Sequence, residues 1–133
     1  MKPVFADTFF FLAAINPKDR AHGAALDWSD HYQGPLVTTA WVVTELADAL
    51  SERRNRDTFR QLHEALLADS RLRLIPASSA LMERGLKLYL SRADKDWSLT
   101  DCISFVVMTD ESLTEALTGD RHFVQAGFQA LLM

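Results

Sequence analysis

The stretch Trp97–Met108, WSLTDCISFVVM, places one carboxylate at the head of a strongly apolar segment. A segment as apolar as Cys102–Met108 is typical of a helix buried in a protein core. Burying the carboxylate of Asp101 is costly unless a partner or a helix end stabilises its charge. The S-x-x-D spacing from Ser98 to Asp101 matches a capping box at the start of a helix. Two interpretations stay open: Asp101 caps a helix, or it faces a site that requires negative charge.

Short β-like runs alternate with helical patterns on both sides of this segment. Strands are expected at 3–6, 36–39, 71–75, 115–118 and 129–132. Helices are expected at 8–14, 18–31, 40–53, 57–68, 78–90, 99–110 and 122–126. Strands that alternate with helices indicate a parallel sheet covered by helices. The predicted fold class is α/β: a three-layer α/β/α sandwich with a small, mostly parallel central sheet.

The composition indicates one globular domain over residues 1–133. Of these residues 48% are apolar and 24% are charged, which fits a packed core and not a disordered chain. Cys102 is the single cysteine and lies in the apolar segment, so a buried, unreactive thiol and a reducing compartment are expected. No run of residues reaches the roughly 18–20 apolar positions of a membrane span, and a cytoplasmic location is expected.

Two aspartates directly follow predicted strands. Asp7 comes after the run PVFA, and Asp120 comes after EALTG. In a parallel α/β sheet, ligands bind outside the carboxyl ends of the strands, so both carboxylates could line one site. Each could instead cap the helix that follows it, because aspartate is a favoured N-cap residue.

Glu45 lies on the predicted helix 40–53, at the edge of its apolar stripe. With about 100° of rotation per residue, Glu45 falls between Val42 and Ala49, which belong to that stripe. Its side chain therefore either reaches solvent from the border of the stripe or lies at the same sheet edge as the aspartates.

Together, the four acids favour a metal site. Carboxylates a few ångströms apart repel one another and raise each other's pKa. A bound Mg²⁺ or Mn²⁺ would relieve the repulsion, since both ions prefer oxygen ligands. Such an ion could also activate water and offset the charge that develops on a phosphodiester during hydrolysis. We therefore expect Asp7, Glu45, Asp101 and Asp120 to act as metal ligands and not as nucleophiles.

The chain resembles the PIN-domain family, and within it the VapC-type toxins of bacterial toxin–antitoxin modules. The most specific matches are WSLTDCISFVVM and TGDRHFVQAGF; weaker ones are VFADTFFFLA and TTAWVVTELADAL. The resemblance covers essentially the whole chain and assigns Asp7, Glu45, Asp101 and Asp120 to an acidic metal site. It also implies a Mg²⁺- or Mn²⁺-dependent endoribonuclease that is neutralised by a cognate VapB-like antitoxin and usually forms a homodimer.

The chain departs from the family pattern at Phe9. The family often has a small hydroxyl residue two places after the first aspartate, and Thr8 could supply that hydroxyl here. Thr118 and Asp96 are also expected near the site. His122 is expected to pack or to cap just after the strand, because water activated by a metal needs no histidine as general base.

Other functions fit the sequence less well. A dehalogenase-type phosphatase needs a second aspartate where Phe9 stands, and the chain has neither a GxGxxG motif nor a P-loop. Two alternatives stay open: a PIN-type nuclease that acts on another nucleic acid, and a non-catalytic binding module with an acidic pocket.

The net charge of −4 is unlike that of a protein that binds nucleic acid over its whole surface. A local cluster of arginines is either a solvated surface or a basic flank for RNA: Arg53, Arg54, Arg56 and Arg60. Several large apolar residues exceed what the core needs, and some are expected at a dimer or antitoxin surface. They include Trp28, Phe59, Leu62 and Leu66.

Overall fold

The computed structural model describes residues 2–133, in which five strands form one sheet in the order β3-β2-β1-β4-β5. The strands are β1 Val4–Ala6, β2 Leu36–Thr39, β3 Leu72–Ile75, β4 Glu115–Leu117 and β5 Gln129–Ala130. Every described strand pair is parallel. The parallel α/β prediction is therefore confirmed.

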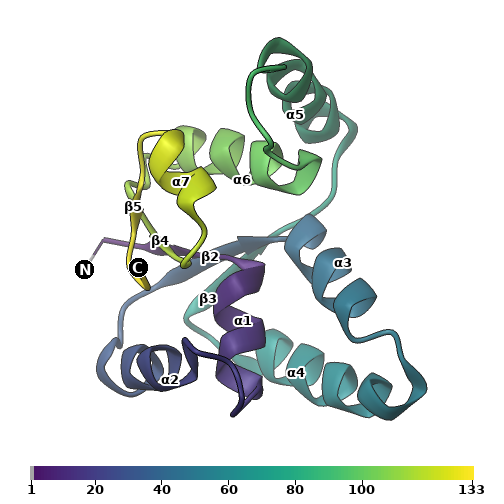
Figure 1. The fold of residues 1–133 in the computed structure, drawn as a ribbon, viewed down its shortest axis with the longest axis vertical. Helices are drawn as coiled ribbons and strands as arrows, with labels where there is room; N and C mark the ends of the chain where they lie inside the picture. Colours follow the sequence, from purple (N-terminus) through teal and green to yellow (C-terminus); the bar gives the residue numbers. More distant parts are fainter. Residues whose placement is uncertain (1) are drawn as a thin grey trace.

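Helices cover both faces of the sheet and give the predicted three layers (Figure 1). They are α1 Thr8–Ile15, α2 His22–His31, α3 Ala40–Ala49, α4 Arg56–Ala68, α5 Ser79–Ser91, α6 Leu99–Asp110 and α7 Arg121–Gln125, with a 3₁₀ helix, η1, at Arg53–Asn55. In Figure 1, α1, α2 and α4 lie below the sheet and α5, α6 and α7 lie above it. Helix α3 contacts both α1 and α6. No helix within residues 2–133 has the length and apolar character needed to cross a membrane.

Two predicted helices differ from the structure. The helix expected at 18–31 begins only at His22, because residues 17–21 form turns. There the side chains of Asn16 and Asp19 accept bonds from the backbone N–H groups of Lys18 and Ala21, at 3.0 and 2.9 Å. Such local bonds compete with helix formation. The helix expected at 40–53 ends at Ala49.

The predicted last strand, 129–132, is regular only over Gln129–Ala130. Its pairing nevertheless continues, since the backbone N–H groups of Leu131 and Leu132 donate to the carbonyl oxygens of Ala116 and Thr118 at 2.9 and 3.0 Å. The end of the chain therefore helps to fix the segment that follows β4.

Helix α6 contains most of the apolar stretch 97–108, and this part of the helix is largely buried, as expected. Cys102, Ile103 and Met108 are fully buried, and the thiol of Cys102 is free. Gly85 lets α5 approach α6 closely, because a Cβ at that position would overlap the side chain of Ile103. This close packing fixes the position of α6 and of the carboxylate in its first turn.

A switch in topology occurs between β1 and β4. From β1 the chain enters α1 on one face of the sheet, whereas from β4 it enters α7 on the other face (Figure 1). Adjacent parallel strands whose connections diverge in this way leave a crevice at their carboxyl ends, where α/β proteins bind ligands. Asp7 follows β1 and Asp120 lies three residues after the end of β4, so both lie at this switch point.

Candidate active site

The structure brings the four predicted acids together at the switch point. Asp7 and Asp120 come from the strand ends, Glu45 from α3, and Asp101 from the first turn of α6. Burial raises the pKa of Asp7, Glu45 and Asp101. Repulsion raises them further, because the charge of Asp101 acts on both Asp7 and Glu45, and that of Asp120 acts on Glu45 and Asp101. The four carboxylates therefore form one coupled group.

Asp7 is 5% exposed and lies deepest in this group. Its side chain makes no capping bond to α1; the helix starts from its backbone carbonyl, which accepts from Phe10 N at 3.0 Å. The carboxylate instead accepts a hydrogen bond from the hydroxyl of Thr118 at 2.8 Å. Burial raises the pKa of Asp7 to about 7, although the bond from Thr118 lowers it. The side chain of Asp7 is thus free of helix capping and interacts with Asp101 and Glu45.

Thr118 connects the two strand-end aspartates. Its side chain is fully buried, and its hydroxyl donates to Asp7 Oδ2 while accepting from the backbone N–H of Asp120 at 3.1 Å. The expectation that Thr118 lies near the site agrees with this contact. A hydroxyl that donates and accepts at once fixes both neighbours in orientation.

Glu45 faces the other carboxylates and does not extend into solvent. Its side chain is partly buried, and the hydroxyl of Thr8 donates to Glu45 Oε1. Thr8 therefore supplies a hydroxyl beside Glu45, as expected from the sequence. The ring of Phe9 packs against Gly119, where a Cβ would overlap it.

Asp101 caps α6 and also faces the other acids, so both interpretations of the sequence apply. The hydroxyl of Ser98 accepts from Asp101 N at 3.0 Å, and Asp101 Oδ2 accepts from Ser98 N at 3.2 Å. The same Oδ2 lies 3.0 Å from Nδ1 of His122. Capping fixes the carboxylate at the helix start without removing it from the site.

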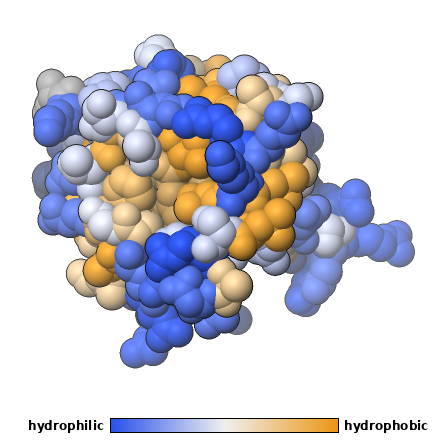
Figure 2. Space-filling model, turned by 90° about the horizontal axis from the view of Figure 1, so that it is seen from above, coloured by the Kyte–Doolittle hydropathy of each residue, from blue (hydrophilic) through white to orange (hydrophobic). Residues whose placement is uncertain are grey.

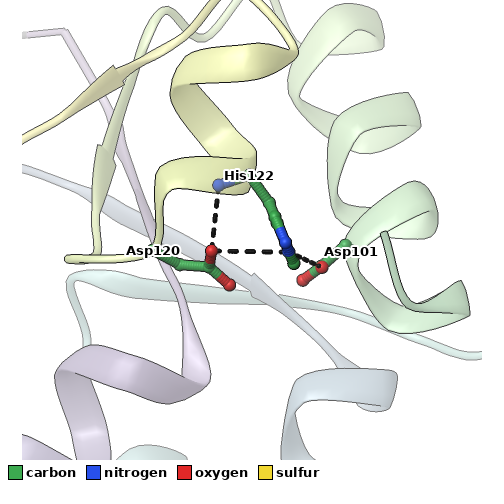
Figure 3. A group of neighbouring side chains, drawn as sticks. All are labelled: Asp101, Asp120 and His122. Carbon is green, nitrogen blue, oxygen red and sulfur yellow. Dashed lines mark hydrogen bonds and ion pairs between the residues drawn. The ribbon is translucent and has the colours of Figure 1, made fainter. Parts of the chain in front are cut away.

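Asp120 caps α7, since its Oδ1 accepts from His122 N at 2.9 Å. The imidazole of His122 lies between the carboxylates of Asp101 and Asp120, with Nδ1 3.4 Å from Asp120 Oδ1 (Figure 3). The sequence predicted only packing or capping for this residue. The missed signal is the Asp-x-His spacing, which places the histidine in the first turn of α7 beside its own cap.

Three of these side chains present ligand atoms within 4.8 Å of one another: Asp101, Asp120 and His122. Within residues 2–133, no other group of three such side chains has this spacing. Carboxylate oxygens are the donors that Mg²⁺ and Mn²⁺ prefer, and a cation would relieve the repulsion that raises the pKa values. The donor set therefore fits a divalent metal.

Asp96 lies outside the contacts of this group. Asp96 is exposed in the loop before α6 and lines a separate hollow with Tyr89 and Arg92. Within the described chain, no hydrogen bond or ion pair joins it to the four acids. Its predicted place near the site is therefore not supported by contact.

The arginine cluster lies on η1 and the start of α4, and its members are exposed. Arg60 pairs with Asp57 and Glu64 at 2.8 and 2.9 Å, and Arg54 pairs with Glu52 at 3.0 Å. Acidic neighbours thus offset part of the basic charge. The apolar residues expected at a partner surface are only partly buried against the core: Trp28, Phe59, Leu62 and Leu66.

Comparison with known proteins identifies relatives over nearly the whole chain. Residues 4–129 match the family model of the PIN domain. The chain is 27% identical over 126 residues to the 23S rRNA-specific endonuclease VapC20 of Mycobacterium tuberculosis, which covers 94% of this chain and 95% of that protein.

Solved structures show the same fold. The crystal structure of VapC20 from Mycobacterium tuberculosis, described as a Sarcin-Ricin loop cleaving toxin, has a TM-score of 0.86 at 24% identity, covering 94% of this chain and 95% of that one. VapBC2 from Rickettsia felis, bound to a DNA fragment from their promoter, has a TM-score of 0.66 at 17% identity and 96% coverage of both chains. FitAcB from Neisseria gonorrhoeae has a TM-score of 0.65 at 19% identity, covering 96% of this chain and 94% of that one. Because the family model spans residues 4–129, this protein belongs to the PIN-domain family.

Proposed function

We propose that this protein is a Mg²⁺- or Mn²⁺-dependent endoribonuclease and the toxin component of a toxin–antitoxin system. The observation that carries the proposal is the convergence of Asp7, Glu45, Asp101 and Asp120 at the switch point of a PIN-family sheet. We treat residues 1–133 as one nuclease domain that acts in the cytoplasm.

All four acids would bind the metal, and neighbouring groups orient the four carboxylates. Ser98 holds Asp101 through the capping box, Thr118 holds Asp7, and Thr8 holds Glu45. When bound, the metal would lower the pKa of water and offset charge on the phosphodiester. The protein contributes a set of carboxylates fixed before the substrate arrives, which avoids the cost of arranging them during the reaction.

RNA is the substrate that the relatives support. The similar VapC20 protein is described as specific for 23S rRNA, so 23S rRNA is the first substrate to test. The exposed side chains of Arg53, Arg54 and Arg56 would bind phosphates of the RNA. A PIN-type nuclease acting on another nucleic acid is the alternative that the same assay examines.

An antitoxin and a second copy of the chain are the proposed protein partners. The resemblance of the chain to VapC-type toxins supports a VapB-like antitoxin, and VapBC2 and FitAcB share its fold. Figure 2 looks onto the α5 side of the molecule and shows a broad apolar area bordered by hydrophilic residues. Exposed apolar residues follow one side of α5: Met82, Leu86, Tyr89 and Leu90. Exposed apolar surface of this kind supports a protein partner.

The test is cleavage of purified 23S rRNA by the purified protein, with Mg²⁺, with Mn²⁺ and with EDTA. We expect cleavage only with metal, at few positions that mapping of the RNA ends would identify. Asp101→Asn should abolish cleavage. Asp48→Asn, which changes an exposed side chain on α3, should leave cleavage intact. Cleavage in EDTA, or full activity of Asp101→Asn, would contradict the proposal. Tight metal binding without cleavage of any RNA or DNA would favour a non-catalytic module.

A further inference from the structure

The imidazole of His122 lies between two of the carboxylates proposed to bind the metal. Its Nδ1 is 3.0 Å from Asp101 Oδ2 and 3.4 Å from Asp120 Oδ1. Octahedral Mg²⁺ or Mn²⁺ binds ligands at about 2.0–2.2 Å, so adjacent ligand atoms lie about 3 Å apart. His122 Nδ1 therefore lies at about this spacing from an oxygen of each carboxylate, and ligand atoms of the three side chains all lie within 4.8 Å of one another. Figure 3 shows the three side chains directed toward one another from two helix starts.

Backbone groups fix both carboxylates of this trio. Ser98 N donates to Asp101 Oδ2 at 3.2 Å, and His122 N donates to Asp120 Oδ1 at 2.9 Å. Each carboxylate keeps further lone pairs, because an ionised carboxylate can accept about four bonds. The side chains of Asp101, His122 and Asp120 are 11%, 20% and 32% exposed, so an ion from solvent can reach them.

We infer that Nδ1 of His122 binds the metal beside Asp101 and Asp120, and that this nitrogen makes the site prefer Mn²⁺ over Mg²⁺. The inference rests on the metal site of the proposed function and extends it to a fifth residue. Mg²⁺ takes oxygen ligands almost exclusively, whereas imidazole suits transition metals. A site with one nitrogen therefore loses affinity for Mg²⁺ more than for Mn²⁺.

A competing arrangement has His122 only orienting Asp101 through their hydrogen bond. In that case the nitrogen never contacts the ion. Removing it would weaken the binding of both metals by similar factors, because only the position of an oxygen ligand would change.

Pulsed electron paramagnetic resonance of the Mn²⁺-loaded protein separates the two arrangements, since it detects ¹⁴N bound directly to the ion. We expect an imidazole ¹⁴N signal that persists in His63→Ala, a histidine stacked on Phe59, and disappears in His122→Ala and His122→Asp. Circular dichroism would verify that each variant is folded.

Binding of each metal alone, measured by calorimetry, gives a second readout that does not depend on RNA cleavage. The ratio of the Mg²⁺ dissociation constant to the Mn²⁺ dissociation constant should fall roughly 10-fold or more in His122→Asp. Even residues that only hydrogen-bond to metal ligands change metal affinity by about 10-fold or more. A missing ¹⁴N signal with an unchanged ratio would overturn the role of His122. If Asp101→Asn also leaves Mn²⁺ binding unchanged, the proposed metal site itself fails.

Discussion

The hydroxyl of Thr118 donates to the carboxylate of Asp7 across 2.8 Å, although the two residues are 111 positions apart in the chain. They meet because β1 and β4 are neighbouring parallel strands whose carboxyl ends lie side by side. Burial, and then repulsion from Asp101 and Glu45, disfavour the ionised form of Asp7. The hydrogen bond from Thr118 favours that form. Thr118 is therefore expected to affect both the charge and the orientation of Asp7.

Thr118→Val should test this relationship, because it keeps the shape of the side chain and removes the hydroxyl. Losing the donor should raise the pKa of Asp7 further and release its orientation, and RNA cleavage should fall roughly 10- to 100-fold. Thr118→Ser keeps a hydroxyl and should retain most of the activity. Equal activity of the Val and Ser variants at neutral pH would show that the hydrogen bond has no role in the site.

The metal-free protein should lose stability as the pH rises from about 4 to 7. The pKa of Asp7 is raised from 3.8 to about 7, so the folded state binds a proton that the unfolded state releases. The resulting stabilisation is complete below pH 3.8 and is lost as the pH rises through 7. This difference in the pKa of Asp7 corresponds to about 4 kcal/mol in the free energy of unfolding, if Asp7 titrates independently of its neighbours.

Asp7→Asn should flatten this pH dependence, as measured by urea unfolding at several pH values in EDTA. Asp94 is a suitable control, since its hydrogen bond and ion pair with Arg92 lower its pKa to about 2. Its contribution to the pH dependence of stability therefore lies below the range of pH 4 to 7. Added Mg²⁺ or Mn²⁺ should restore stability near pH 7 in the parent chain, because a cation favours the ionised carboxylates. A stability that rises between pH 4 and 7 in EDTA would contradict the buried, protonated state of Asp7.

Gly119→Ala should disturb the site through Phe9. A Cβ at position 119 would overlap the end of the Phe9 ring, so either the ring or the segment that carries Asp120 has to move. We expect lower RNA cleavage and a lower melting temperature. Phe9→Ser should restore both in the double variant, because it removes the ring. If the two changes act additively in a double-mutant cycle, the contact does not position Asp120.

Neutralising Arg53, Arg54 and Arg56 together should weaken RNA binding without stopping cleavage at saturating RNA. Each lost phosphate contact reduces the dependence of binding on salt, so the slope of log affinity against log salt should become shallower. Arg60→Gln is the control, because Arg60 is paired with two carboxylates, Asp57 and Glu64, whereas within residues 2–133 Arg54 is paired only with Glu52. A change in the maximal cleavage rate with unchanged binding would place these arginines in the chemistry itself.

The sequence predicted the parts of the site that depend on local pattern. Asp7 and Asp120 follow apolar runs that read as strands, and the spacing from Ser98 to Asp101 defines a capping box. The Asp-x-His spacing places His122 beside Asp120, but its contact with Asp101 depends on how α6 and α7 pack, which no local pattern encodes. The turns at residues 17–21 were missed for the opposite reason, because short side-chain bonds to the backbone outweighed the helical pattern of the segment.

The strongest test of the site is whether its four acids act as one unit. Asp7→Asn, Glu45→Gln, Asp101→Asn and Asp120→Asn each remove one charge and keep the shape of the side chain. Each should abolish most RNA cleavage, because residues that act together are strongly non-additive. A second substitution should therefore add little to the first.

Without metal, Asp101→Asn should not destabilise the fold. Asp101→Asn relieves repulsion on Asp7 and Glu45, and its amide oxygen can still accept from Ser98 N. Its free energy of unfolding in EDTA should therefore be equal to that of the parent chain or higher, while stabilisation by added Mn²⁺ should shrink. Asp48→Asn, on the exposed side of α3, should change neither quantity. Four additive losses of cleavage, or a fully active Glu45→Gln, would mean that the acids meet in space without sharing a metal.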